Sequence, residues 1–394
     1  MNATEKDLLF TRLNTTFVVR VLVVLGKALG RLLPLRNRSA LFFFFPFYHV
    51  GGAEKVHAGI VGCFAEEKPW VFFTKKSAND GFLPAFGTGA RLFDVWFLLK
   101  YGYPFSVGVM AGFIGRHRDA VVFGSNSLFF SLLLEHLDRS VRAVDLVHAF
   151  GGGSEIFTLP QSGRLQARVA INRKTVEDLR EQYARHGLPE EWNDRVVLIE
   201  NCVEVPPEYP MKECRSKLKA LYVGRGSEEK RVHLVGRVAT RCLQAGIAVE
   251  VTVVGDALQA VGEAERACCT FLGEISDPRE LTRLYDEADV LLLTSSREGF
   301  PMVIMEGMAH GVVPVSTPVG GIPVHVTSGE NGWLVDEGLG EDEIVAQMCR
   351  ILARMSDERD LLSRMSHAAY DYARTNFHGE RFCASYRTLL LENR

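Results

Sequence analysis

The 394-residue sequence has few of the features that mark a specialised class of protein. Its eight cysteines form no CxxC pair and have no histidines at zinc-site spacing, which argues against a zinc site and indicates reduced thiols in a cytoplasmic protein. It also has no DxD-like pair of aspartates, so no motif in it suggests a bound metal ion. No apolar run reaches the roughly twenty uninterrupted residues that a membrane-spanning helix needs.

The charged residues show no strong excess of either sign. Lysine and arginine number 45 against 48 aspartate and glutamate residues, which gives a formal net charge of −3. The chain therefore has no overall attraction for nucleic acid, and we expect no nucleic-acid partner. Its 47% hydrophobic residues are typical of a globular protein, and the length favours two domains over a single core.

An amphipathic, basic segment opens the chain, and we take residues 1–38 as an N-terminal extension. The stretch TFVVRVLVVLGKALGRLLPLR is interrupted by Arg20, Lys27 and Arg31, which fall within about 40° of one another on a helix, while apolar residues cover the rest. Such a helix can lie on an anionic membrane through residues 12–38. Alternatively, it packs against its own domain with snorkelling basic heads.

From residue 40 onward, short apolar runs alternate with amphipathic stretches, as in parallel α/β sheets. A first set of predicted strands covers residues 40–47, 68–74, 119–126, 142–150, 167–172 and 195–201. A second set covers residues 219–225, 247–256, 269–274, 289–295 and 312–317. The aromatic, basic stretch 90–105 is read either as a core helix with a turn or as an acceptor-facing or membrane-facing surface.

The two sets of strands predict two Rossmann-like, doubly wound domains. The first covers residues 39–205, and a proline-rich linker, 206–217, leads into the second domain at 218–370. The tail, 371–394, has a helical pattern. Because ligands bind at the carboxyl ends of parallel strands, we expect the site in a cleft between the two facing domains.

Two cations follow the first strand of the second domain. Arg225 and Lys230 lie five positions apart in the loop GRGSEEKR, where both can reach one point near the start of the next helix. This arrangement suits the two phosphates of a diphosphate. Because Glu228 and Glu229 lie between them, the loop is also compatible with a solvated charge cluster.

Two glutamates, Glu298 and Glu306, flank a turn and an apolar run in EGFPMVIMEGMAHG. Proline favours the first helical position, so we expect the helix to begin at Pro301, with Glu298 in the entering loop and Glu306 within the first two turns. The backbone at Gly299, Phe300 and Pro301 then presents unpaired helix N–H groups, and the carboxylates accept from hydroxyls. A nucleotide sugar offers both chemistries. Alternatively, Glu306 is a surface residue or a charge that stabilises the helix N-terminus.

Glycines and a histidine end two strands of the first domain. Gly51 and Gly52 follow the first strand, where they let the backbone approach a ligand closely, although a plain tight turn is equally compatible. His148 ends another strand and precedes three glycines that leave it accessible, although a lone histidine is more often structural. Together with the second domain, four strand ends carry ligand-type chemistry.

From about residue 40 to the C-terminus, the chain resembles the retaining GT-B glycosyltransferases of family 4. The resemblance rests on GGAEKV, LVHAF, YVGRGSEEKR, VVGD, FLGEIS, SSREGFPMVIMEGMAHGVVPVST, VGGIP and GENGWLV. It implies that Arg225 and Lys230 neutralise the donor diphosphate and that Glu306 accepts from the ribose hydroxyls. It also implies that the tail 371–394 crosses back to the first domain.

The resemblance assigns further residues to the donor. Glu298, with the backbone at 299–301, resembles the group that holds hydroxyls of the transferred sugar, and His148 resembles the histidine near the reacting carbon. Gly52 resembles the loop over the diphosphate, while Gly255 and Glu274 lie in segments that flank the base. The sequence departs from the family pattern at Cys202, which follows Asn201 where glycine is usual, and at Val324 and His325, where the family commonly has glutamate after Ile-Pro.

These readings favour a retaining hexosyl transferase that moves sugar from a nucleotide-sugar donor to a glycan or lipid-linked acceptor, in cell-surface polysaccharide or glycolipid synthesis. Neither a metal nor another cofactor is expected, and we expect a cytoplasmic protein, peripheral on the inner face of the membrane. Two alternatives remain open from the sequence. One is a nucleotide-sugar epimerase of GT-B fold, and the other is a non-catalytic, membrane-associated partner subunit of a transferase.

Overall fold

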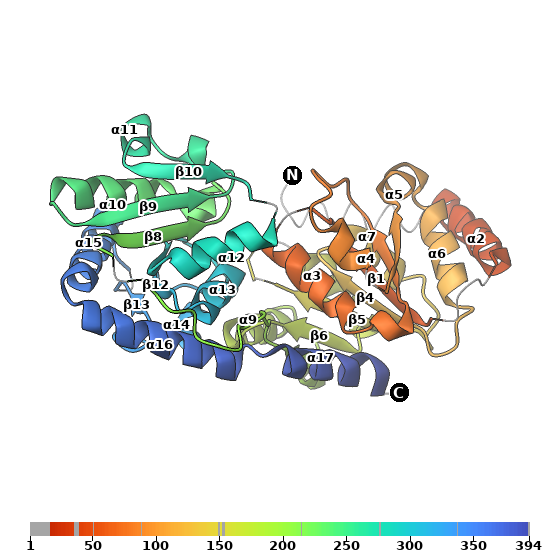
Figure 1. Cartoon of the computed structure of the whole chain (residues 1–394). Helices are drawn as coiled ribbons and strands as arrows, with labels where there is room; N and C mark the ends of the chain where they lie inside the picture. The colour runs from red at the N-terminus through yellow and green to blue at the C-terminus, as the bar shows by residue number, and fades with distance from the viewer. Residues whose placement is uncertain are drawn as a thin grey trace. The chain divides into compact units, whose positions relative to one another are not determined.

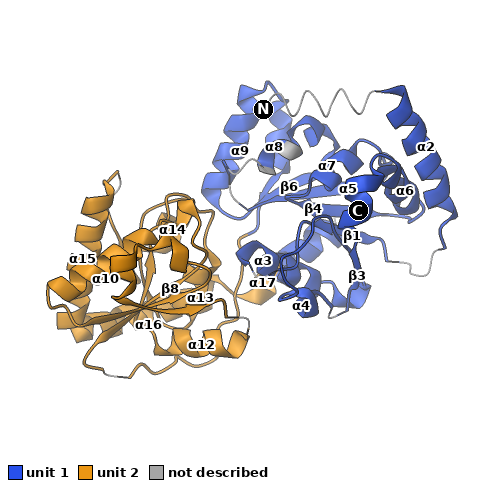
Figure 2. Cartoon of the chain, turned by 90° about the horizontal axis from the view of Figure 1, so that it is seen from above, with its two compact units in different colours: residues 1–199, 383–394 blue, residues 200–382 orange. Residues whose placement is uncertain are grey.

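A computed structural model describes most of the chain, in two compact units. The described residues are 16–34, 39–49, 51–87, 89–148, 150–151, 154–213, 215–275, 277–336 and 338–392. One unit comprises residues 1–199 with 383–394, and the other comprises residues 200–382 (Figure 2). The first boundary therefore falls at 199/200, earlier than expected, and the linker 206–217 belongs to the second unit. The chain rejoins the first unit at residue 383 rather than 371.

The first unit is built on a seven-stranded parallel sheet in the order β3-β2-β1-β4-β5-β6-β7 (Figure 1). Its strands are β1 (Leu41–Phe45), β2 (Trp70–Phe73), β3 (Arg91–Asp94), β4 (Val121–Ser125), β5 (Arg142–Val147), β6 (Ala167–Ala170) and β7 (Val196–Leu198). Its helices are α2 (Phe17–Leu32), α3 (Gly52–Gly62), α4 (Leu83–Gly87), α5 (Trp96–Gly102), α6 (Phe105–Ile114), α7 (Leu128–Leu134), α8 (Ser154–Phe157) and α9 (Arg173–Arg185).

The second unit contains a six-stranded parallel sheet in the order β10-β9-β8-β11-β12-β13. Its strands are β8 (Leu218–Val223), β9 (Val249–Val254), β10 (Cys269–Gly273), β11 (Val290–Leu293), β12 (Val313–Ser316) and β13 (Trp333–Leu334). Its helices are α10 (His233–Gln244), α11 (Glu263–Arg266), α12 (Pro278–Glu287), α13 (Met302–Ala309), α14 (Ile322–His325), α15 (Glu341–Asp357) and α16 (Arg359–Asn376), and α17 (Gly379–Arg387) continues into the first unit. The predicted fold class of two Rossmann-like domains is confirmed.

Strand β1 shows why the first sheet lies inside its unit. All five of its residues are buried, as expected for a parallel strand covered on both faces. Because side chains alternate along a strand, Phe42 and Phe44 join the cluster formed with α6 and α7, whereas Phe43 and Phe45 contact Phe64 and His57 on the α3 side. The phenylalanine run therefore fixes the positions of helices on both faces.

Helix α2 packs on α6 through glycines (Figure 1). A Cβ added to Gly30 would lie 2.1 Å from the Val109 carbonyl oxygen, and one added to Gly112 would lie 2.2 Å from the Lys27 carbonyl oxygen. The two backbones approach closely because both helices carry a GxxxG spacing, the second glycine pair including Gly108. One face of α2 thus packs on its own unit. This agrees with the second of the two alternatives for this segment, in which the helix packs against its own domain.

The opposite face of α2 leaves large apolar side chains exposed. Phe17 is 81% exposed, Val24 65% and Leu32 79%, and the row includes Val18, Val21, Leu25 and Leu29. In the stretch 90–105, α5 likewise exposes Phe97, Leu98 and Tyr101 but buries Leu99 in the core, so the core-helix interpretation holds for only one face of this helix. None of the helices in the described part of the chain combines the length and apolar composition needed to cross a bilayer.

The C-terminal tail is attached to the first unit by a disulfide between Cys63 and Cys383. Arg387 adds a hydrogen bond to the Cys63 carbonyl oxygen at 2.8 Å and an ion pair with Glu67 at 2.7 Å. Arg142, at the start of β5, donates to the Leu390 carbonyl oxygen at 2.7 Å. The expectation that all thiols are reduced is therefore wrong for this pair, because the fold joins two cysteines that are 320 positions apart.

Candidate functional site

The sheet of the second unit has a topological switch point between β8 and β11. All six strands are parallel, but the order in which the chain adds them reverses here: on one side of this point lie β8, β9 and β10, and on the other lie β11, β12 and β13. The loops after β8 and β11 therefore diverge at the carboxyl edge. In open α/β sheets, this is where ligands bind. The loop after β8 contains Arg225 and Lys230, and the loop after β11 contains Glu298. The two loops singled out in the sequence are therefore neighbours in the fold.

Backbone and side-chain hydrogen bonds join these two loops. The backbone N–H of Ser296 donates to the Glu229 carbonyl oxygen at 2.8 Å. The hydroxyl of Thr294 donates to the carbonyl oxygens of Lys230 and Arg231 at 3.0 Å each. In return, the guanidinium of Arg231 donates to the carbonyl oxygen of Thr294 at 2.7 Å and to that of Ser295 at 3.1 Å. The loops thus hold each other in place without using the side chains of Lys230 and Glu298.

Lys230 and Glu298 form an ion pair at the centre of this arrangement. The Lys230 Nζ lies 2.5 Å from Oε1 of Glu298, and the Ser295 hydroxyl donates to the same oxygen at 2.6 Å. The side chain of Glu298 is 9% exposed and that of Lys230 22%. Both contacts use Oε1, and no described residue hydrogen-bonds to Oε2 of Glu298. The carboxylate is therefore fixed by one oxygen and has acceptor capacity on the other.

Arg225, in the same loop as Lys230, has an exposed side chain. Its backbone carbonyl oxygen accepts a hydrogen bond from the Tyr222 hydroxyl at 2.9 Å. Burial, together with the nearby carboxylates of Glu298 and Glu229, raises the pKa of Tyr222, so that hydroxyl remains a donor. Burial acts to raise the pKa of Glu229. The hydrogen bond from Ser227 and the charges of Arg225 and Lys230 outweigh burial, so this pKa lies below its usual value.

The turn at Gly299–Pro301 is supported from behind. The N–H of Gly321 donates to the Gly299 carbonyl oxygen at 2.6 Å, and Gly320 has a positive φ of 61°. A Cβ on Gly320 would lie 2.0 Å from the Glu298 carbonyl oxygen, so the VGG segment approaches the turn more closely than another residue allows. The buried Phe300 ring stacks on His325, with centroids 4.2 Å apart. Helix α13 begins at Met302, one residue later than predicted, and Pro301 precedes it.

Glu306 occupies the middle of α13 and is buried, so it is not a surface residue. Its Oε2 accepts a hydrogen bond from the Tyr285 hydroxyl at 2.8 Å. Burial raises the pKa of Tyr285 well above its usual value, and the Glu306 carboxylate adds to that rise. Tyr285 therefore stays protonated and holds the carboxylate in one orientation, while the contact with ribose hydroxyls stays a prediction.

The remaining residues predicted to bind the sugar donor in the second unit follow adjacent strands. Gly255 follows β9 and Glu274 follows β10, and the N–H of Gly255 donates to the Gly273 carbonyl oxygen at 2.7 Å. Gly255 has a φ of +113°, and a Cβ there would lie 2.1 Å from the Gly224 carbonyl oxygen. Only glycine permits this close approach to the loop that carries Arg225. Glu274 is exposed at the same edge of the sheet.

In the first unit, the structure places both predicted residues near the carboxyl edge of the sheet. Gly52 is the first residue of α3, and His148 directly follows β5. The Nε2 atom of His148 lies 2.9 Å from Nε2 of His57, which comes from the middle of α3. No sequence motif marks His57, Ser295 or Tyr285. The partners of His57 and Tyr285 lie 91 and 21 positions away, and the bond from Ser295 to Glu298, three positions on, depends on the shape of the loop.

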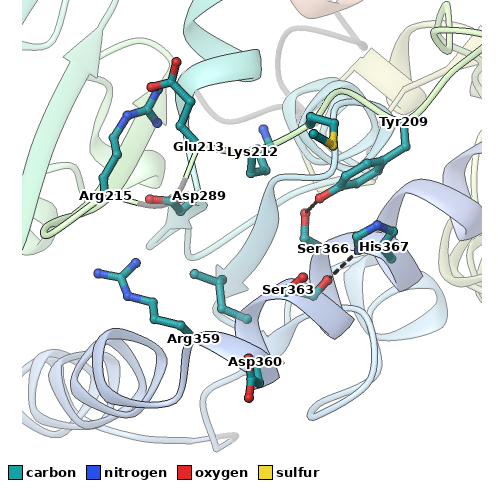
Figure 3. Close-up of a pocket in the computed structure, with 12 residues that line it drawn as sticks. Tyr209, Lys212, Glu213, Arg215, Asp289, Arg359, Asp360, Ser363, Ser366 and His367 are labelled. Atoms are coloured by element: carbon teal, nitrogen blue, oxygen red, sulfur yellow. Dashed lines mark hydrogen bonds and ion pairs between the residues drawn. The ribbon is translucent and has the colours of Figure 1, made fainter.

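A separate hollow of about 320 Å³ lies elsewhere on the second unit, and none of the predicted site residues line it (Figure 3). Asp289 lines this hollow and directly precedes β11, so the hollow lies at the amino-terminal edge of the sheet, opposite the edge that carries Lys230 and Glu298. Its lining includes Lys212, whose Nζ donates to the carbonyl oxygens of Tyr285 and Asp286 at 2.8 and 3.0 Å. Arg215 donates to the Glu287 carbonyl oxygen at 2.9 Å. These cations cap the C-terminus of α12 and hold the linker on the unit.

Sequence comparison finds a family match within the second unit. Residues 217–354 match the family model described as Glycosyl transferases group 1. The chain is 39% identical over 97 residues to D-inositol 3-phosphate glycosyltransferase of Corynebacterium efficiens, an alignment that covers 25% of this chain and 22% of that protein. It is 30% identical over 145 residues to the putative colanic acid biosynthesis glycosyltransferase WcaL of Escherichia coli, covering 32% and 34%. These alignments span between about a fifth and a third of the relatives' lengths.

Solved structures extend the likeness to both units. The fold is similar to that of Anabaena Alr3699/HepE in complex with UDP-glucose, with a TM-score of 0.69, 17% identity, and coverage of 89% of this chain and 99% of that one. It is also similar to the lipopolysaccharide outer core galactosyltransferase WaaB, with a TM-score of 0.63, 18% identity, and coverage of 90% and 99%. At such identities the likeness shows the fold alone. The chain therefore has the GT-B fold and carries a glycosyl transferase group 1 domain, which confirms the resemblance to GT-B glycosyltransferases of family 4.

Proposed function

We propose that the protein is a retaining, metal-independent glycosyltransferase that moves a hexosyl group from a nucleotide-sugar donor to a glycan or lipid-linked acceptor. The observation that carries the proposal is the cluster of Lys230, Glu298 and Ser295 at the switch point of the second unit. A cation and an oriented carboxylate, side by side, suit a ligand that carries both phosphate and hydroxyl groups. The relatives named above include proteins of polysaccharide biosynthesis, which suggests the class of acceptor.

The proposed chemistry follows from the charges that develop. Breaking the anomeric C–O bond builds negative charge on the leaving diphosphate and positive charge on the sugar ring. Lys230 and Arg225 stabilise the diphosphate, since preorganised cations act most strongly where charge accumulates. Binding of the diphosphate draws Lys230 partly away from Glu298, which then offers its oxygens to sugar hydroxyls. The acceptor attacks from the face that the diphosphate leaves, and the departing phosphate takes the acceptor's proton.

Glu298 is not assigned as a nucleophile. Its Oε1 accepts from both Lys230 and Ser295, and these two bonds lower the reactivity of the carboxylate by stabilising its charge. A covalent glycosyl-enzyme of the glycosidase type needs a second carboxylic acid as well. Glu306 does not serve as that acid, because it is buried against Tyr285 within α13. The roles of binding and orientation therefore fit Glu298 better than covalent catalysis.

Donor turnover tests the proposal. The purified chain is incubated with UDP-, GDP- and ADP-linked hexoses, one at a time, and the nucleotide products are separated by chromatography. We expect slow release of the matching nucleoside diphosphate from one donor, even without an acceptor. An epimerised sugar without release would favour the epimerase. If no nucleoside diphosphate binds or is released under any condition, the transferase proposal fails.

We also propose that the exposed face of α2 lies on an anionic membrane surface, as a peripheral contact on its cytoplasmic side. The apolar row of α2 faces outward, and the exposed Arg20 and Arg31 run along one border of it. No aspartate or glutamate occurs between residues 16 and 34, so the segment has no charge that opposes an anionic bilayer. A neutral partner protein would not account for the basic border.

Vesicle binding tests the membrane proposal by point substitutions, because deleting α2 would uncover its glycine contact with α6. The full chain is expected to sediment with vesicles that contain phosphatidylglycerol and not with pure phosphatidylcholine. Replacing Val24 and Leu25 by Glu should weaken this binding about tenfold or more. Leu243→Glu, which changes a 69% exposed leucine on α10 of the second unit, is the control. Equal binding by both variants would contradict the proposal.

A further inference from the structure

His57 is a buried histidine for which the proposed chemistry has no use so far. It lies in the middle of α3, and its side chain is completely enclosed. Its ring stacks on Phe45, the last residue of β1, with the centroids 4.1 Å apart and the planes 14° from parallel. The ring therefore has little freedom to turn, and its Nε2 atom is aimed at Nε2 of His148, 2.9 Å away.

The hydrogen bond between the two rings has only one consistent direction. A neutral imidazole carries one N–H donor and one acceptor nitrogen. Nδ1 of His57 is buried and has no hydrogen-bond partner. If His57 accepted at Nε2, its proton would be on Nδ1, which would leave an enclosed N–H without an acceptor. Orphaned buried N–H groups are rare, whereas an unfilled acceptor is tolerated more easily. His57 therefore donates from Nε2, and His148 accepts.

This direction decides the tautomer of His148. Because its Nε2 accepts, its proton is on Nδ1. His148 is partly exposed, and Nδ1 has no hydrogen-bond partner among the described residues. His148 thus turns its acceptor inward to His57 and presents an N–H donor at the carboxyl edge of the sheet.

We infer that His57 is a positioning residue that fixes His148 as a neutral Nδ1–H donor, at the carboxyl edge of the first unit's sheet, toward a hydroxyl of a sugar substrate. The inference rests on the proposed function for the identity of the ligand, but the orientation of the two rings does not depend on it. His57 acts through His148 and does not itself touch the donor. A functional side chain at a strand end needs a rigid neighbour to hold its orientation. For His148, that neighbour is His57, whose ring is fixed on α3 by its stack on Phe45.

Neutrality of His148 has a chemical reason. The sugar ring gains positive charge when the anomeric bond breaks, and an imidazolium nearby would oppose that charge. Burial, and then the charge of His148, lowers the pKa of His57 well below its usual value. Burial also lowers the pKa of His148 to about 4. Both rings are therefore neutral near pH 7.

Nitrogen NMR of the full chain, labelled with ¹⁵N-histidine, tests the tautomer without any substrate. The spectrum of His148→Asn identifies the signals of His148. We expect wild-type His148 in the Nδ1–H form and unchanged between pH 5.5 and 7.5. Observation of the Nε2–H form in the wild type would overturn the inference. This result requires only the wild-type spectrum and the assignment, so it does not depend on whether a His57 variant folds.

Two substitutions then test the role of His57. His57→Phe keeps a ring on Phe45 but removes the donor, whereas His57→Gln retains an amide N–H donor. In His57→Phe, we expect His148 to lose its single tautomer and kcat for donor turnover to fall about tenfold or more, with UDP affinity within about twofold of the wild type. His57→Gln should restore both the tautomer and most of kcat. An unchanged tautomer in His57→Phe, or an equal loss in the two variants, would contradict a positioning role.

Failure of this inference is distinguishable from failure of the proposed function. If wild-type His148 has the Nδ1–H form but the chain releases nucleoside diphosphate from no donor, the transferase proposal fails and the ring orientation stands. If the chain turns over a donor but His148 has the Nε2–H form, the role of His57 is wrong and the proposed function stands.

Discussion

At the scale of single residues, the candidate site shows how a side chain acquires a role through its partners. The sequence indicated Lys230 and Glu298 by their positions after strands. It did not indicate that Ser295 fixes the same carboxylate oxygen that Lys230 contacts, nor that Tyr285 holds Glu306. Ser295 lies in the same loop as Glu298, and its contact depends on the conformation of that loop, whereas Tyr285 on α12 reaches Glu306 on α13 only because the two helices lie side by side in the fold. Residue types at strand ends are therefore readable from sequence, whereas the contacts that orient them are not.

The two buried histidines predict a pH dependence of stability. The folded pKa of His148, about 4, is below the value of about 6.5 that an unfolded histidine has, and that of His57 is lowered as well. A group with a depressed folded pKa stabilises the fold above the unfolded pKa, and this contribution is lost as pH falls toward the folded pKa. We expect the free energy of unfolding to decrease between about pH 6.5 and 4, with His148 contributing at most about 3 kcal/mol.

Urea unfolding followed by circular dichroism at several pH values measures this contribution. His57→Gln and His148→Asn each remove one of the two titrating rings and are expected to flatten the decrease. His378→Asn is the control, because His378 is exposed before α17 and its ring accepts a hydrogen bond from the nearby Glu380 N–H. If the free energy of unfolding depends on pH equally in the wild type and in both ring variants, burial does not lower the pKa of either histidine and the prediction is wrong.

At the scale of secondary structure, the hydrophobic pattern predicted most elements correctly. Every predicted strand is present, since buried parallel strands appear as short apolar runs bounded by Gly, Asn or charge. The prediction omitted β3 and β13. Strand β3 is a partly exposed edge strand within a stretch of aromatic residues, and β13 has only two residues. Edge and very short strands lack the apolar run on which the prediction depends.

The packing of α2 on α6 gives a prediction for glycine. Gly112→Ala places a Cβ 2.2 Å from the Lys27 carbonyl oxygen, so the helices must separate, and we expect a loss of about 1–3 kcal/mol in the free energy of unfolding. Gly62→Ala on α3 is the matched control, because nothing lies within 4 Å of its added Cβ. That change should be neutral or stabilise by about 0.4–1 kcal/mol. Similar effects of both changes in urea unfolding would contradict the close contact.

At the scale of the whole molecule, the α/β class and the number of domains follow from the alternating pattern, but the boundaries do not. The proline-rich linker 206–217 looks like a boundary in sequence, yet Tyr209, Lys212 and Arg215 attach it to the second unit. Likewise, the tail joins the first unit through Cys383, which no local pattern pairs with Cys63. These contacts join residues between 72 and 320 positions apart, and such contacts leave no periodic signal in the sequence.

The structure pairs Cys63 with Cys383, whereas the sequence predicted reduced thiols, and the two can be distinguished by experiment. We expect a peptide pair joined through Cys63 and Cys383 in a proteolytic digest made without reducing agent, detected by mass spectrometry after alkylation of free thiols. Dithiothreitol should convert the pair to two separate peptides. Cys242 and Cys349, which are buried and not disulfide-bonded, serve as an internal comparison. Full alkylation of Cys63 and Cys383 in the non-reduced chain would contradict the pairing.

In the proposed function, the loops after β8 and β11 together bind a nucleoside diphosphate. Isothermal titration calorimetry with UDP, GDP and ADP tests it most directly, comparing the wild type with Lys230→Ala and with Lys217→Ala, which breaks the exposed ion pair to Glu250. We expect the wild type to bind one of the three nucleotides. Lys230→Ala should weaken that binding by about 1.5–3 kcal/mol, the value typical of one charge-assisted hydrogen bond, and Lys217→Ala should leave the affinity unchanged. Equal affinity for the wild type and Lys230→Ala would contradict the claim.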